Sequence, residues 1–273
     1  MKFRTRSYGI LAFLALAGCR ALSEPSHEQL NGILWMQTSA EYRVASIQTF
    51  RAAEHSAQEA LENRNWTAVF EQTNDYQSLP PAVITDVDET VLDNTPFQAQ
   101  LVLENAAFDA KKWTAWVREC RAEAVPGAKE FIAFLKSKNI RVFYVTNRTQ
   151  KEPTLLNLRR VLDPEVTEEQ VLCKNEQPGW GSDKTSRRTF LAQKYRILLL
   201  LGDDYNDFSF LGNGSPEERT ARAESQTAFW GKKWFLISNP LYGSWERALY
   251  DFDYGLSTDQ QLNKKIRHLK ASY

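Results

Sequence analysis

The sequence is poor in cysteine and histidine, and it has no excess of charge of either sign. Its 273 residues include 3 Cys and 3 His, and 34 basic residues balance 34 acidic ones. The histidines are scattered, which leaves little support for a histidine-based metal site or catalytic triad, and the cysteines have no close partners for a zinc site. Without a block of like charge, nothing indicates binding to a nucleic acid or a polybasic contact with a membrane. No internal repeat or low-complexity tract is present.

The sequence begins with a short targeting pattern. Three basic residues precede an apolar run over residues 8–17, which is too short to span a bilayer as a helix. The run ends in Leu16-Ala17-Gly18-Cys19, which resembles the bacterial lipobox, in which the Cys is lipidated and becomes the mature N-terminus. We therefore predict a signal peptide over residues 1–18, lipidation of Cys19 and a tether over 19–28. The alternative is an ordinary signal peptide with Cys19 by coincidence.

The residue after Cys19 bears on the membrane that would carry the anchor. It is Arg20, whereas an Asp at this position favours retention in the inner membrane of Gram-negative bacteria. We therefore expect a lipid-anchored protein of the bacterial cell envelope, sorted to the outer membrane. This compartment permits a disulfide between Cys120 and Cys173, which the sequence leaves open.

The mature chain shows a helical pattern and then alternating strands and helices. Apolar residues recur every three or four positions from Leu30 to about Leu61, which predicts a helix, and we expect a second helical piece at 66–70. Short apolar runs then predict five strands, at 82–85, 142–145, 171–172, 197–201 and 234–237, with helical stretches between them. This alternation predicts a parallel sheet covered by helices on both faces.

Polar residues follow several of the expected strands. Asp86-Val87-Asp88-Glu89-Thr90 comes directly after the first strand, which can present both Asp carboxylates at the strand's end. Thr146 ends the second strand, Lys184 begins a helix, and Gly202-Asp203-Asp204-Tyr205-Asn206-Asp207 follows the fourth strand. Each signal has a plain structural alternative, such as a helix cap at Asp88 or a solvated basic turn at Lys184. Together they predict an acidic site with one cation at a single sheet edge.

The order D-x-D-x-T, Thr, Lys and G-D-x-x-x-D is similar to that of the haloacid dehalogenase superfamily. More narrowly, residues 86–94 (DVDETVLDN) and 202–208 (GDDYNDF) resemble the bacterial class C acid phosphatases of lipoprotein type. Segments 34–42, 113–117, 125–128 and 242–246 are also similar to the family pattern, so the resemblance covers roughly residues 30–250. Val87, Phe97 and Asp204 depart from it, and Asp204 adds a charge beside the expected metal site.

The resemblance implies a fold and a division of the chain. The fold is a three-layer α/β/α Rossmann-like core with a parallel sheet, plus a smaller helical domain. The phosphatase domain covers residues 29–273. Within it, residues 29–78 form an N-terminal helical layer and 97–125 a cap-like segment.

The resemblance also implies a mechanism. Asp86 is the nucleophile that forms an aspartyl phosphate, Asp88 is the general acid and base, and Thr146 and Lys184 bind the phosphoryl group. Mg²⁺ is held by the Asp86 carboxylate, the Asp88 backbone carbonyl and Asp203. Asp207 holds a metal-bound water or Lys184.

Substrate choice depends on a different set of residues. Trp113 and Tyr242 match family positions that stack on an aromatic part of the substrate, and we assign Asn147, next to Thr146, to substrate binding. From composition alone, both aromatic residues would be core residues. The implied activity is that of a Mg²⁺-dependent acid phosphatase and 5′-nucleotidase acting on nucleoside monophosphates, nicotinamide mononucleotide or aryl phosphates, in a homodimer.

Two other functions remain open at this point. One is a sugar-phosphate or phosphonate hydrolase of the same superfamily. The other is a surface lipoprotein that binds a ligand without catalysis.

Overall fold

The computed structural model describes residues 27–73 and 75–272, so the predicted signal peptide and Cys19 lie outside the described residues. The main sheet has five parallel strands in the order β5-β4-β1-β6-β7. The strands are β1 (Pro81–Thr85), β4 (Arg141–Thr146), β5 (Val171–Cys173), β6 (Arg196–Gly202) and β7 (Trp234–Leu236). They correspond to the five predicted strands. A second, two-stranded sheet pairs β2 (Leu92–Asp93) with β3 (Glu123–Ala124) in antiparallel orientation.

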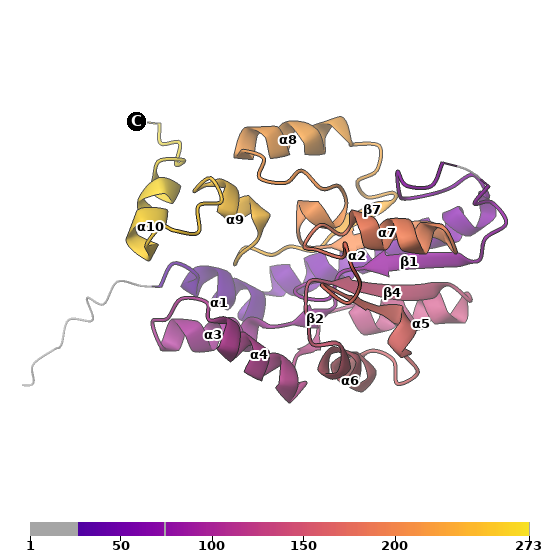
Figure 1. Ribbon diagram of the computed structural model, residues 1–273, viewed down its shortest axis with the longest axis horizontal. Helices are drawn as coiled ribbons and strands as arrows, with labels where there is room; N and C mark the ends of the chain where they lie inside the picture. The colour runs from indigo at the N-terminus through magenta and orange to yellow at the C-terminus, as the bar shows by residue number, and fades with distance from the viewer. Residues whose placement is uncertain (1–26, 74, 273) are drawn as a thin grey trace, which may run out of the picture.

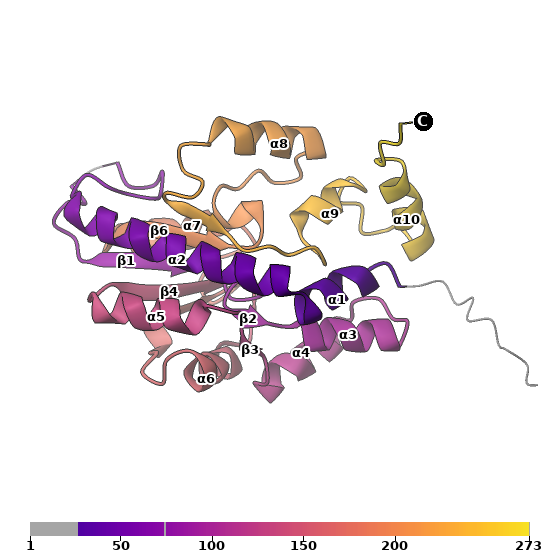
Figure 2. The ribbon, with the colours of Figure 1, turned by 180° about the vertical axis from the view of Figure 1, so that it is seen from behind.

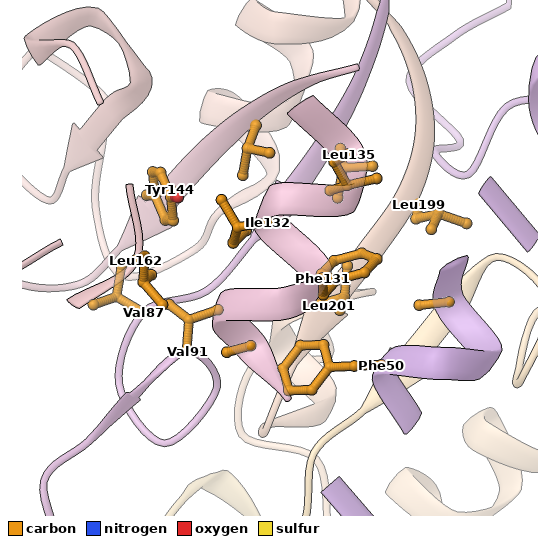
Figure 3. Close-up of a cluster of buried hydrophobic side chains, with 14 of the residues drawn as sticks. Phe50, Val87, Val91, Phe131, Ile132, Leu135, Tyr144, Leu162, Leu199 and Leu201 are labelled. Atoms are coloured by element: carbon orange, nitrogen blue, oxygen red, sulfur yellow. The ribbon is translucent and has the colours of Figure 1, made fainter. Parts of the chain in front are cut away.

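Both faces of the main sheet are covered by apolar clusters. Successive side chains of a strand point to opposite faces and so enter different clusters. In β1, Val83 belongs to one apolar cluster, and Ala82 and Ile84 belong to another. The first cluster packs under α2 (Ala40–Glu62), α5 (Ala128–Ser137) and α6 (Lys151–Val161), where Phe50 meets Phe131 with ring centroids 5.4 Å apart. Figure 3 shows how side chains of this cluster from α2 and α5, such as Phe50 and Phe131, face side chains of the strands, such as Leu201. The second lies against α7 (Thr185–Ala192). The α/β/α layering predicted from the sequence is confirmed.

The other helices lie mostly around the edge toward which β1 points. Figures 1 and 2 show α1, α3, α4, α9 and α10 on that side, away from the start of the sheet. Their bounds are α1 (Leu30–Thr38), α3 (Thr95–Leu103), α4 (Ala110–Glu119), α8 (Pro216–Ser225), α9 (Ser244–Ala248) and α10 (Thr258–Ile266), with short 3-10 turns at Glu168–Gln170 and Tyr205–Asp207. Because the chain leaves β1 directly into this region, α3 and α4 come to lie next to the residues that end the strand.

Two predictions for the N-terminal helices are wrong. The single helix expected from Leu30 to Leu61 is broken at Ser39, which has extended backbone and whose side chain accepts a hydrogen bond from the Tyr42 N–H. Ser39 thus acts as the N-cap of α2 and starts a new helix axis. The expected helical piece at 66–70 is instead turn and extended chain, because its polar groups bond to β6: the Trp66 indole and the Ala68 N–H donate to Leu198 and Ile197 carbonyls, at 2.7 and 2.8 Å.

The two described cysteines are free thiols. Cys173 is buried in β5, and Cys120 is half-buried at the end of α4. No helix within residues 27–73 and 75–272 has the length and apolar character needed to cross a membrane.

Candidate functional site

Three carboxylates gather where β1 and β6 end side by side. Asp86 follows β1, Asp203 follows β6, and Asp207 lies in the turn just beyond. Each offers an oxygen within 4.8 Å of the others. Gly202 at the end of β6 permits this approach, since a Cβ there would lie 2.4 Å from Asp207. The sheet therefore concentrates negative charge at its carboxyl edge.

Lys184 supplies one positive charge to this group. It occupies the N-cap position of α7 and is 5% exposed. Its ammonium forms ion pairs with Asp86 and, at 2.7 Å, with Asp207. Burial raises the pKa of Asp86, and the adjacent ammonium opposes that rise. One cation among three carboxylates leaves the group with excess negative charge.

Asp203 is the carboxylate of the group that Lys184 does not contact. Its two oxygens accept hydrogen bonds from Thr90 Oγ1 at 3.0 Å and Asn239 Nδ2 at 2.8 Å, and within the described parts of the chain no Lys or Arg forms an ion pair with it. Burial, Asp207 and Asp86 together raise the pKa of Asp203 well above its ordinary value. Hard carboxylate oxygens this close together suit a divalent cation such as Mg²⁺, which would relieve the repulsion. The residues present therefore fit a metal ion.

The Asp88 carboxylate points away from this cluster. Its Oδ1 accepts hydrogen bonds from Arg148 Nε at 2.9 Å, Arg148 Nη2 at 2.7 Å and Asn94 Nδ2 at 2.8 Å. The side chain is not one of the three clustered carboxylates, so any contribution of Asp88 to the metal falls to its backbone. Two carboxylates only two residues apart are thus held in different surroundings.

Glu89 connects Asn94 with Tyr242. Its backbone is left-handed, with φ of 56°, an uncommon conformation for a residue other than glycine, and its side chain is fully buried. The carboxylate accepts hydrogen bonds from the Asn94 N–H at 2.9 Å and from the Tyr242 hydroxyl. Burial and the nearby Asp88 raise the pKa of Glu89 well above its ordinary value.

Thr146 and Asn147 lie at the end of β4, next to β1. Thr146 is buried, and its hydroxyl accepts a hydrogen bond from the Arg148 N–H at 3.1 Å. Asn147 is exposed and bonds to the Ser182 carbonyl at 3.1 Å, in the loop before Lys184. Arg187, fully buried in α7, donates to the Thr146 carbonyl and, at 2.8 Å, to the Asn147 side chain. This arginine fixes the end of β4 against the start of α7.

Trp113 and Tyr242 are both half-buried and border the same region. The Arg148 guanidinium lies 5.4 Å from the centre of the Trp113 ring, and Phe97 meets the same ring edge-on with ring centroids 5.2 Å apart. Tyr242 reaches the site through its bond to Glu89. Each predicted aromatic residue is therefore linked to a group that surrounds Asp88.

Asp204 does not add its charge to the metal site, contrary to the expectation from sequence. Its carboxylate accepts hydrogen bonds from the Asn206 N–H and from the N–H and hydroxyl of Ser244, and it pairs with Arg219 at 3.6 Å. These contacts turn the side chain toward α8 and α9. The charge is compensated away from the three clustered carboxylates.

The residues that hold the predicted ones in place were not predicted from the sequence. They are Arg148, Asn94, Glu89, Thr90 and Asn239. Four of the five stand within or next to the quoted motifs, so a signal existed. The motif alone did not show which side chain each of them contacts.

Comparisons with known proteins agree with this architecture. The family model described as HAD superfamily, subfamily IIIB (acid phosphatase) matches residues 16–245. The chain is also similar to the class C acid phosphatase from Bacillus anthracis, with 31% identity, a TM-score of 0.79 and coverage of 90% of this chain and 98% of that one. A second structure of that phosphatase, with tungstate bound, matches equally well. The chain therefore belongs to the acid phosphatases of the haloacid dehalogenase superfamily, subfamily IIIB, and is a phosphomonoesterase.

Proposed function

We propose that this acid phosphatase transfers the phosphoryl group of a small monoester to Asp86 and then releases it to water. The observation that carries the proposal is the separation of two carboxylates on one short segment. Asp86 lies with Lys184, Asp203 and Asp207, whereas Asp88 lies on Arg148 and Asn94. The first environment suits a nucleophile facing phosphate, and the second suits an acid and base facing the leaving group.

Each step follows from these positions. A carboxylate oxygen of Asp86 attacks phosphorus while the phosphorus–oxygen bond to the leaving group breaks, and Asp88 gives its proton to the departing oxygen. Water then attacks the acyl phosphate, Asp88 takes a proton from that water, and the Asp86 carboxylate departs. Lys184 and the Thr146 hydroxyl stabilise the negative charge of the transferring group.

The same residues would hold Mg²⁺ through Asp86, Asp203 and the Asp88 carbonyl, with Asp207 in support. When bound, the ion supplies positive charge that offsets repulsion between the phosphoryl oxygens and the carboxylates. Support for a metal comes from the three carboxylates, which share a single ammonium group.

For the substrate we propose nucleoside monophosphates, nicotinamide mononucleotide and aryl phosphates. Support comes from Trp113 and Tyr242, which are half-buried and next to the residues around Asp88. The tungstate bound in the Bacillus anthracis phosphatase is a tetrahedral oxyanion like phosphate, which supports oxyanion binding here. A panel of nucleotides, sugar phosphates and phosphonates separates this proposal from the sugar-phosphate or phosphonate alternative.

The decisive test removes the nucleophile without changing its shape. Asp86→Asn should lower phosphate release from a nucleoside 5′-monophosphate and from 4-nitrophenyl phosphate by at least about 10³-fold. Radiolabel from a ³²P-labelled substrate, trapped by acid quench, should appear on the wild-type protein and be absent from the variant. Asp109→Asn, an exposed cap of α4, is the matched control and should keep activity. Labelled protein in Asp86→Asn would overturn the assignment.

We also propose that Cys19 carries lipid and anchors the enzyme in the bacterial envelope, at the outer membrane of a Gram-negative cell, and that the enzyme forms a homodimer. Support for the anchor is the sequence pattern before Cys19. Cys19→Ser should abolish incorporation of labelled palmitate and move activity from the membrane fraction to the soluble one. Light scattering of the purified enzyme tests the dimer, and a mass of one chain would refute it.

A further inference from the structure

Arg148 is a nearly inaccessible cation whose contacts are concentrated on Asp88. It follows Thr146 by two residues at the end of β4 and is only 2% exposed. Its Nε lies 2.9 Å from Asp88 Oδ1 and 3.2 Å from Oδ2, and its Nη2 lies 2.7 Å from Oδ1. Its remaining nitrogen, Nη1, is buried with no hydrogen-bond partner in the described part of the chain. The side-chain hydrogen bonds of Arg148 thus go to Asp88 and to Asn94, which bonds to the same carboxylate.

Asn94 holds the same carboxylate from a second direction. Its Nδ2 donates to Asp88 Oδ1 at 2.8 Å, while its own oxygen accepts from the Trp116 indole at 2.8 Å and from Arg148 Nη2 at 3.1 Å. These two donors fix which way the Asn94 amide faces. Asp88 is therefore clamped by Arg148 from the loop after β4 and by Asn94 from the start of α3.

The clamp treats the two Asp88 oxygens differently. Oδ1 accepts three hydrogen bonds shorter than 3.0 Å, which occupies its lone pairs, whereas Oδ2 accepts one at 3.2 Å. The oxygen left to exchange a proton with the substrate is thus Oδ2. Fixing one oxygen sets the direction in which the other one points.

The clamp also contacts Trp113, one of the two aromatic residues that border the site. The Trp113 ring lies over the Arg148 guanidinium, with 5.4 Å between the guanidinium carbon and the ring centre. Such a contact restricts the guanidinium plane. A flat leaving group stacked on Trp113 would touch the same ring that fixes Arg148.

We propose that Arg148 is a positioning residue that directs Asp88 Oδ2 at the leaving-group oxygen, and that Trp113 couples this positioning to an aromatic leaving group. The inference rests on the proposed function of Asp88. In the step concerned, the phosphorus–oxygen bond breaks, its electron pair stays on the leaving oxygen, and the proton of Asp88 Oδ2 moves to that oxygen as Asp86 bonds to phosphorus. Arg148 exchanges no proton.

The test compares leaving groups that do and do not need protonation. The 4-nitrophenolate ion leaves readily as an anion, whereas the alkoxide of a nucleoside 5′-monophosphate requires a proton. Arg148→Met should therefore reduce kcat/KM for the nucleotide by about 100-fold, within the range of a general acid, and for 4-nitrophenyl phosphate by less than about 5-fold. Because kcat/KM reports steps up to the first phosphoryl transfer, slow hydrolysis of the phosphoenzyme does not hide the difference. Arg148→Lys, which keeps the charge, should show an intermediate loss.

Matched variants separate positioning from a loss of structure. Arg187→Met removes another buried arginine at the same sheet edge, on the phosphate side. It should reduce kcat/KM for the nucleotide and for 4-nitrophenyl phosphate by the same factor. Millimolar guanidinium should restore nucleotide turnover to Arg148→Ala but not to Arg187→Ala.

The coupling through Trp113 is tested with a series of aryl phosphates. Trp113→Leu should increase the difference in kcat/KM between esters of good and of poor leaving groups. An unchanged difference would overturn the coupling through Trp113. Thermal melting verifies that each variant is folded, and Asn94→Ala, with the same expected selectivity, replaces any Arg148 variant that is not.

Asp88→Asn distinguishes the two possible failures. If it reduces kcat/KM for both substrates by the same factor, the proposed role of Asp88 as the acid is wrong. If it discriminates between leaving groups while the folded Arg148 variants do not, the proposed function stands and the positioning role of Arg148 is overturned.

Discussion

Asp86 and Asp88 show how one short motif provides two different carboxylates. The Asp86 carboxylate pairs with Lys184, and the Asp88 carboxylate pairs with Arg148. Neither pairing is visible in the letters of the motif. The surroundings are set by Arg148 in the loop after β4 and by Lys184 at the N-cap of α7, which are distant in sequence.

Asp204 provides a prediction at the same scale. Replacing it with Asn removes the negative charge that faces the buried Arg219 while keeping the shape of the side chain. We expect Asp204→Asn to lower the free energy of unfolding by about 1–2 kcal/mol, as for a weakened charged hydrogen bond. The Mg²⁺ concentration for half-maximal activity should stay within about twofold of the wild-type value, because the carboxylate faces away from the cluster. Chemical denaturation and a metal titration check the two parts, and a large shift in the metal requirement would contradict the assigned orientation.

The sequence predicted which residues gather, but not which pairs touch. Asp86, Thr146 and Asp203 were predictable because the carboxyl ends of parallel strands meet at one edge. Arg148 and Asn94 were not, because their roles depend on where long or branched side chains point after the chain has folded. Asp204 was misjudged for the same reason, since its contacts with Ser244 of α9 and Arg219 of α8 depend on where these helices pack in the folded chain.

At the scale of elements, the end of β6 sets the spacing of the acidic residues. Gly202 is the last residue of the strand, and a Cβ added there would meet both the Cβ and a carboxylate oxygen of Asp207 at 2.4 Å. The turn that follows would have to move. The distance between β6 and Asp207 is therefore tied to the absence of a single methyl group.

Gly202→Ala should reduce activity by about 10- to 100-fold through displacement of Asp207 from Lys184, since errors of about 1 Å in a site can cost 10²-fold. The Mg²⁺ requirement should rise with it. Gly181→Ala is the matched control, because a Cβ at that position meets nothing within 4 Å. Steady-state kinetics over a range of metal concentrations measure both effects, and wild-type kinetics in Gly202→Ala would show that the turn relaxes freely.

The elements themselves were largely readable from the sequence. The five strands carry continuous apolar runs because both sheet faces are buried. The break at Ser39 was missed because a serine within an apolar helical period looks like any exposed position. The segment at 66–70 was missed because Trp66 and Ala68 satisfy their polar groups on β6, a contact made by tertiary structure and not by local preference.

For the whole molecule, the acidic cluster links metal binding to stability. Burial raises the pKa of Asp203 well above its ordinary value and that of Asp86 to about 7. The metal-free folded protein therefore holds protons that the unfolded chain, with carboxyl pKa values of about 4, has released. These two carboxyl groups therefore stabilise the metal-free form most below about pH 4, and their contribution declines as pH rises toward 7.

A divalent ion replaces those protons and should cancel the decline. The difference in melting temperature between enzyme with Mg²⁺ and enzyme with EDTA should increase from about pH 4 to 7 by several degrees, since 1 kcal/mol shifts a domain of this size by about 2–4 °C. Differential scanning fluorimetry at a series of pH values measures it. Asp203→Asn should flatten the increase, and a difference independent of pH in the wild type would argue against a metal at these carboxylates.

Trp113 and the three clustered carboxylates belong to different parts of the molecule, so the two parts can change independently. The clustered carboxylates are anchored in the sheet, whereas Asn94, Trp113 and Trp116 come from the α3–α4 region. Substitutions in α3 and α4 can therefore alter which alcohol part of the ester is accepted, while the residues that bind and transfer phosphate stay unchanged. Relatives of this enzyme can thus differ in substrate range and share one reaction.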